Sequence, residues 1–266
     1  MLESVESARH WWWAAAGKHP VSRDYVRLGH LSPFADGFAE WVKNGYRTLD
    51  PKENRPVSAF CSWRFWARGF GKESLVLGVV KDSSDAMGRQ YPFLVLGNGP
   101  LKGWENHWDL LPLACEETWS RMEYLSLTMP EGFGRLEKEI HHGIRPPLPE
   151  WSQHAARRKS VGEEGGAFEG KASFLERECA ALSGRMEILI DLDHEAAGDP
   201  FAMAALWNRI LRIHLPAVPN ALLLGGTQER ACLAVFLRPL MPSDFVQLWS
   251  VSRGGKPCVA PNVPSA

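Results

Sequence analysis

Two aspartates, Asp24 and Asp85, are of a type and spacing that could support acid–base chemistry in this chain. Asp85 lies in a polar turn between two apolar stretches, and Asp24 lies in an earlier loop. If the two loops met, the paired carboxylates could act as general acid and general base. Each carboxylate could instead pair with a nearby arginine, namely Arg23, Arg64 or Arg89. We favour a salt-bridged clamp, because no nucleophile with a suitable base lies near either aspartate in sequence.

A second acidic cluster, Asp191 to Glu195, reads Asp-Leu-Asp-His-Glu. Two carboxylates separated by one residue at the end of a strand can hold a hard cation through their oxygens. The same acids would also favour the N-terminus of a following helix. No second cluster offers further ligands, so we interpret this stretch as a solvated loop and expect no metal.

Short motifs for other chemistries are missing from the sequence. It contains no GxSxG elbow, no HExxH, no GxxxxGK[ST] phosphate loop and no GxGxxG fingerprint. The five cysteines include no CxxC pair, which excludes a standard zinc or redox motif. We therefore expect neither catalytic residues nor a cofactor.

The stretch Gly78 to Leu96 predicts a hairpin in which two buried strands flank the polar turn over 82–88. Ser32, followed by Pro33, predicts the start of a helix whose apolar face carries Phe34, Phe38, Trp41 and Val42. Further helices are expected over 54–60, 104–127 (divided or kinked at Pro112), 131–142, 172–182, 200–215 and 242–249. Further strands are expected over 63–66, 186–192, 221–224 and 231–237, with 11–13 as a strand or an aromatic plug.

Composition indicates a globular protein of 266 residues with 45% hydrophobic and 23% charged residues. The net charge of -1 provides no electrostatic case for binding nucleic acid or an anionic membrane. Acidic residues stand near the N-terminus where a signal peptide needs positive charge, and no apolar run reaches membrane-spanning length. We therefore expect a cytoplasmic protein without direct membrane insertion.

These patterns predict an α/β fold (α+β type): a mixed, largely antiparallel sheet sandwiched between helices. Residues 1–10 and 251–266 are expected to be disordered tails. Between them, 11–250 would form a single domain of two sub-halves joined by a mobile loop over 150–171, a stretch rich in glycine and in charges of both signs.

Three segments, in order, resemble the TagF (ImpM) family associated with bacterial type VI secretion. The pattern Gly-Lys-x-Pro-x-x-Gly-Asp-Phe-Val is matched by Gly17, Lys18, Pro20, Asp24, Tyr25 and Val26. The Trp-Arg-Phe strand is matched by Trp63, Arg64 and Phe65, and the Ser-x-Asp-x-x-Gly-Arg-x-x-Pro signature by Ser83, Asp85, Gly88, Arg89 and Pro92. The resemblance extends from about Trp11 to Trp249. It departs from the family at Arg23, which stands where Gly is usual, at Tyr25 for Phe, and at Asp82 for Pro.

The resemblance implies a cytoplasmic accessory protein, not an enzyme, that restrains type VI secretion by binding a forkhead-associated scaffold protein or another secretion component. We predict that Lys18–Asp24 and Asp85–Tyr91 form one polar surface, braced by Arg64 and ringed by aromatic residues, which docks the partner. The predicted partner-binding or clamp residues are Lys18, Pro20, Arg23, Asp24, Tyr25, Trp63, Arg64, Ser83, Asp85, Gly88, Arg89, Tyr91 and Pro92.

Two other functions are compatible with the sequence. A hydrolase or metal-dependent enzyme using Asp24 and Asp85, or the 191–195 cluster, would need a deep pocket lined by those acids. A structural component of the secretion assembly would form stable oligomers.

Overall fold

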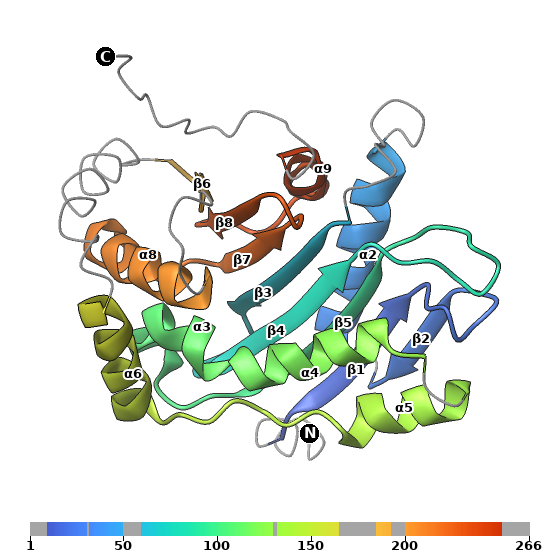
Figure 1. Cartoon of the computed structure of the whole chain (residues 1–266), viewed down its shortest axis with the longest axis horizontal. Helices are drawn as coiled ribbons and strands as arrows, with labels where there is room; N and C mark the ends of the chain where they lie inside the picture. Colours follow the sequence, from blue (N-terminus) through green and yellow to red (C-terminus); the bar gives the residue numbers. More distant parts are fainter. Residues whose placement is uncertain are drawn as a thin grey trace.

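The computed structural model describes residues 10–30, 32–49, 60–129, 132–164, 185–192 and 200–251 (Figure 1). Its strands are β1 (Trp12–Gly17), β2 (Val26–Gly29), β3 (Ser62–Arg68), β4 (Ser74–Lys81), β5 (Phe93–Pro100), β6 (Glu187–Asp191), β7 (Ala221–Gly226) and β8 (Ala231–Phe236). Its helices are α2 (Pro33–Thr48), the short 3-10 turns η2 (Trp104–Asn106) and η3 (Trp108–Leu110), α3 (Leu111–Ala114), α4 (Glu116–Leu127), α5 (Phe133–His142), α6 (Trp151–Glu164), α8 (Pro200–His214) and α9 (Pro242–Val251).

The described strands form one eight-stranded sheet in the order β2-β1-β5-β4-β3-β7-β8-β6. All the pairings between them are antiparallel. The hairpin predicted over Gly78–Leu96 is formed by β4 and β5, and β3 completes the predicted antiparallel trio. Because β3 also pairs with β7, strands from both sides of 150–171 belong to the same sheet.

Helices cover both faces of this sheet, which confirms the predicted α/β sandwich (Figure 1). Alternate residues of each strand point to opposite faces. On β3, Trp63 and Phe65 join the core beneath α2 and α9, whereas Trp66 joins the core beneath η2, η3, α3, α4 and α8. The aromatic-rich sequence is thus used mainly to fill two cores, one on each side of the sheet.

The helix α2 begins where the sequence predicts. The Ser32 hydroxyl accepts a hydrogen bond from the Ala35 N–H at 3.2 Å, which caps the helix, and Pro33 occupies the first turn. Its apolar face lies on the sheet, where Trp41 and Val42 are buried. The Phe38 ring stacks on Phe65 of β3, so the helical spacing read from sequence identified the inward face correctly.

The predicted mobile loop over 150–171 is wrong for most of its length, because α6 occupies Trp151–Glu164. The glycines of this stretch begin only at Gly162, and the residues before them are ordinary helix formers. Tertiary contacts hold the helix: the Trp151 indole donates to the Lys102 carbonyl at 2.9 Å, and Arg158 pairs with the buried Asp109. Residues 165–171 lie outside the described part.

The other expected elements differ mainly at their ends. The 104–127 stretch is divided, as predicted, into η2, η3, α3 and α4. Two expected helices, over 54–60 and 172–182, lie outside the described residues, except for Phe60. The tails 1–9 and 252–266 and the acids at 193–195 lie outside them as well. The single-domain boundaries stay a prediction. None of the described helices has both the length and the apolar character to cross a membrane.

Candidate protein-binding site

The β4–β5 connection is a tight, hydrogen-bonded loop. The Tyr91 N–H donates to the Ser83 carbonyl at 3.0 Å, and Ser84 and Gln90 form an isolated bridge above it. At the tip, the Gly88 N–H donates to the Asp85 carbonyl at 2.9 Å. Gly88 has φ of 75°, a left-handed conformation that favours glycine. The Gly-Arg pair of the sequence signature is therefore required by the shape of this loop.

The Asp85 carboxylate lies at the centre of the loop and is buried, with 2% of the residue exposed. One oxygen accepts the backbone N–H groups of Met87 and Arg89 at 3.0 and 2.9 Å. The other accepts Arg89 Nε at 2.8 Å and lies 3.1 Å from Lys18 Nζ. Burial raises the pKa of Asp85, but the hydrogen bonds from Arg89, Lys18 and Met87 outweigh it and lower this pKa to about 2. A carboxylate so fully bonded is a structural brace.

The same loop holds the earlier loop, residues 18–25, in place. The Ala86 N–H donates to the Ser22 carbonyl at 2.8 Å. The Arg89 guanidinium donates to the Arg23 carbonyl and reaches Asp24 Oδ1 at 3.1 Å. We call the two loops, 18–25 and 82–92, the two-loop clamp. Asp24 and Asp85 thus pair with the same arginine, Arg89. This is the salt-bridged arrangement that we favour from the sequence.

The 18–25 loop also has a defined local structure. The Ser22 N–H donates to the His19 carbonyl at 2.9 Å, which closes a turn with Pro20 at its second position, where proline is favoured. Arg23, which replaces the usual family Gly, does not need positive φ; Glu73 is the non-glycine residue with positive φ in the described part. The replacement is therefore accommodated without strain at this position.

Exposed side chains make up the outer face of the clamp. The side chains of Asp24 and Arg89 are 86% and 56% exposed. Met87 at the loop tip is 66% exposed and Tyr25 is 43% exposed. Since the backbone beneath is fixed by hydrogen bonds, these four side chains form a surface of mixed polar and apolar character on a rigid support.

Three tyrosines line one side of this surface. The ring of Tyr91 contacts Tyr25 and Tyr46 edge to face, with centroids 5.5 and 5.0 Å apart. The Tyr46 hydroxyl donates to the Gln90 carbonyl at 3.3 Å, which links α2 to the loop. Burial raises the pKa of Tyr25 and of Tyr91, so both rings carry protonated hydroxyls at neutral pH. Tyr46 was not predicted, although it continues the α2 face at helical spacing from Phe38 and Val42.

Asp82 anchors the base of the clamp. Its carboxylate accepts the Cys61 N–H at 3.1 Å and the Trp249 indole N–H at 2.9 Å. The family proline that it replaces could accept neither bond, so this departure ties the hairpin to α9.

Some predicted site residues do not belong to the clamp surface. Trp63 is fully buried in the core and donates to Cys61 Sγ at 3.1 Å. Arg64 forms a two-point ion pair with Glu123 of α4, with Nε–Oε1 2.7 Å and Nη2–Oε2 2.5 Å; its role as a brace of the clamp stays a prediction. Its inward position on β3 aims it at α4, a partner that lies 59 residues away in sequence. Pro92 is buried beneath the loop.

His19 is a structural residue that sequence reasoning missed, although it lies between the matched Lys18 and Pro20. It is fully buried, its Nδ1 accepts the Val21 N–H at 3.2 Å, and its Nε2 lies 3.2 Å from the Leu125 carbonyl. These bonds define a neutral ring that joins the clamp to α4. Burial lowers the pKa of His19, which agrees with that state.

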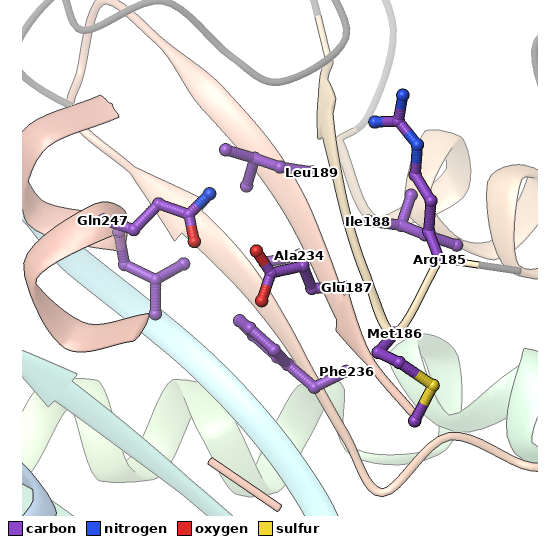
Figure 2. Close-up of a pocket in the computed structure, with 9 residues that line it drawn as sticks. Arg185, Met186, Glu187, Ile188, Leu189, Ala234, Phe236 and Gln247 are labelled. Atoms are coloured by element: carbon purple, nitrogen blue, oxygen red, sulfur yellow. The ribbon is translucent and has the colours of Figure 1, made fainter. Parts of the chain in front are cut away.

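Of the acids that an enzyme would use, the described ones, Asp24, Asp85 and Asp191, line neither of the two cavities that we describe. One cavity, of about 320 Å³, lies between β6, β8 and α9, where Glu187 and Gln247 face a floor of Leu189 and Phe236 (Figure 2). The other is a small depression beside α2 lined by residues such as Ala16 and Arg27. Asp191 is held by Arg230, with Oδ2–Nη2 2.6 Å. Among the described residues, no group of three or more His, Cys, Asp or Glu side chains could hold a metal ion.

Residues 14–138 match the family described as the TagF N-terminal domain, type VI secretion system-associated. The three motifs that resemble the TagF family in the sequence all lie within this matched region. A solved structure, PA0076 from Pseudomonas aeruginosa PAO1, is 18% identical with a TM-score of 0.49, over 96% of this chain and 99% of that one. No curated protein matches the chain.

Proposed function

We propose that this protein is a non-catalytic, cytoplasmic accessory protein that restrains type VI secretion by binding a forkhead-associated scaffold or another component of the machine. The TagF match over 14–138 supports the link to type VI secretion. The observation that supports binding is the outer face of the two-loop clamp, where exposed Tyr25, Met87 and Arg89 stand on a hydrogen-bonded backbone.

Such a face suits protein recognition for two physical reasons. Tyrosine and arginine supply much of the binding energy of many interfaces. A surface that is already rigid loses less conformational entropy when it is bound. The inner residues of the clamp have a different task, since Asp85 and Lys18 hold the two loops together. If an Asp85 variant lost binding, the result would therefore not show whether Asp85 contacts the partner or only holds the two loops in place.

The test uses two exposed side chains of the outer face: Tyr25, whose ring contacts Tyr91, and Met87 at the loop tip. The full chain would be titrated against the purified forkhead-associated scaffold of its own secretion machine by biolayer interferometry. We expect Tyr25→Ala/Met87→Ala to weaken binding at least tenfold. The matched control is Tyr124→Ala/Met129→Ala, which removes the same two residue types from exposed positions outside the clamp and should change affinity less than twofold.

Secretion in the host supplies the second readout. A strain lacking the gene should secrete more of a type VI substrate, and the wild-type gene should restore restraint. If Tyr25→Ala/Met87→Ala also restores it fully, the clamp surface is refuted. If the variant fails but the purified scaffold does not bind the wild-type protein, the partner is another component and the scaffold assignment is wrong.

A further inference from the structure

The connection between α5 and α6 reads Ile-Arg-Pro-Pro-Leu-Pro-Glu over residues 144–150 and runs along the outside of the molecule (Figure 1). Each proline fixes its own φ near −65°. Each proline also pushes the residue before it toward the β or polyproline II region. Since Arg145, Pro146 and Leu148 all precede a proline, the sequence restricts nearly every backbone angle of the segment to polyproline II values.

Burial along the segment follows the period of that helix. Polyproline II has three residues per turn, so positions i and i+3 share an edge. Ile144 and Pro147 are buried and form the inner edge. Pro146 and Pro149 are exposed together on a second edge, and Arg145 and Leu148 on the third, with Leu148 59% exposed.

Contacts on either side hold the segment in place. The Thr118 hydroxyl of α4 donates to the Arg145 carbonyl at 2.9 Å. Just beyond the segment, the Trp151 indole donates to the Lys102 carbonyl and the ring stacks on His107. Within the part of the chain that the structure describes, the carbonyls of 146–149 accept no hydrogen bond. The segment is thus an ordered ridge with free backbone acceptors.

We infer that Arg145–Pro149 is a docking ridge for a partner domain whose groove is lined by aromatic side chains and carries a carboxylate for Arg145. Two prolines three residues apart on one edge are the features that such grooves accept, and the preformed helix lowers the entropic cost of binding. The exposed guanidinium next to Pro146 supplies the charge complementarity. This ridge shares no residue with the two-loop clamp, so it does not depend on the function proposed for that surface.

The experiment measures binding of the full chain to a panel of purified SH3, WW and EVH1 domains by fluorescence polarisation. We expect at least one domain to bind with a micromolar Kd. Pro146→Ala/Pro149→Ala should weaken that binding at least tenfold, and Arg145→Glu at least fivefold. Pro239→Ala, at an exposed proline outside the ridge, is the matched control and should have no effect. A synthetic peptide of residues 144–151 should bind severalfold more weakly than the protein, because it is not held in place.

Three results would overturn the inference. Failure of every domain in the panel to bind the wild-type protein would exclude an aromatic-groove partner of these classes. Equal binding by the wild type and by Pro146→Ala/Pro149→Ala would show that another surface is used. Self-association of the wild type, lost in that variant by light scattering, would make a second copy of this chain the occupant. Circular dichroism checks the fold, and Arg145→Glu, which changes only an exposed side chain, repeats the test should the double variant misfold.

Discussion

Replacing Asp82 by alanine removes the acceptor that joins the base of the clamp to two distant segments. The Cys61 N–H and the Trp249 indole N–H both donate to this carboxylate, and both residues are fully buried. In the Asp82→Ala variant these donors have no acceptor, and burying an unsatisfied donor is costly. We therefore expect a marked loss of stability together with loosening of α9 against the hairpin.

The magnitude follows from the two bonds. A hydrogen bond to a charged group contributes about 1.5–3 kcal/mol, so two contribute about 3–6 kcal/mol. Because Asp82 is only half-buried, water can accept part of the hydrogen bonding that the carboxylate provided. We therefore expect the free energy of unfolding to fall by about 2–4 kcal/mol. Asp82→Asn keeps one carbonyl-type oxygen, which can still accept from the Trp249 indole, and should lose about half as much.

Urea unfolding followed by tryptophan fluorescence measures the effect. With a slope of about 3 kcal/mol per molar urea for a chain of this size, the midpoint of Asp82→Ala should fall by about 1 M. A double-mutant cycle with Trp249→Phe isolates the indole bond from the loss of ring packing and should give a coupling of about 1–2 kcal/mol. Two results would refute this account of Asp82. One is a shift of the Asp82→Ala urea midpoint of less than about 0.2 M, which is about 0.6 kcal/mol at that slope. The other is a coupling energy near zero between Asp82 and Trp249.

Two further predictions concern the support of the clamp. Burial lowers the folded-state pKa of His19. The contribution of the neutral ring to folding stability should therefore be complete above about pH 6.5, the pKa of an unfolded histidine. It should decrease as the pH falls through the lower folded-state pKa. Melting temperatures between pH 5 and 8 should show this loss in the wild type and a weaker slope in His19→Gln; parallel curves would contradict it. Gly17→Ala should destabilise by about 1–3 kcal/mol, because Gly17 has φ of 128° and an added Cβ would overlap the Pro92 carbonyl. Gly37→Ala, at an open position within α2, should instead stabilise by up to about 1 kcal/mol, and the same sign for both glycines in thermal melts would count against this explanation.

Features with a local cause could be predicted from the sequence. The cap of α2 depends on Ser32 and Pro33, and its buried face depends on residues three and four apart. The β4–β5 loop is also local, since Asp85 bonds the N–H groups two and four residues ahead and Gly88 supplies positive φ. These arrangements involve neighbours along the chain, so the order of the residues is sufficient to indicate them.

Partners far apart in the sequence could not be assigned in the same way. The sequence predicts Arg64 as a brace of the clamp and does not indicate its ion pair with Glu123 on α4, which the alternation of β3 brings within reach. The composition of the charged and glycine-containing stretch 150–171 predicts a loop, whereas Arg158 and the buried Asp109 hold its first part as α6. Neither contact could be predicted, because pairing between the sheet and its helices, and between one helix and another, depends on tertiary structure.

The sequence by itself determined that this chain has a TagF-like hairpin, a capped aromatic helix and strands for a largely antiparallel sheet, because each follows from neighbouring residues. Only the tertiary structure decided that Asp85 is a buried brace while Tyr25 and Met87 face outward, and that Asp82 connects the hairpin to Trp249, 167 residues away. Whether a polar side chain supports a surface or forms it depends on what packs over it. Which segment packs over a side chain is set by the order of strands in the sheet, because this order brings distant segments together.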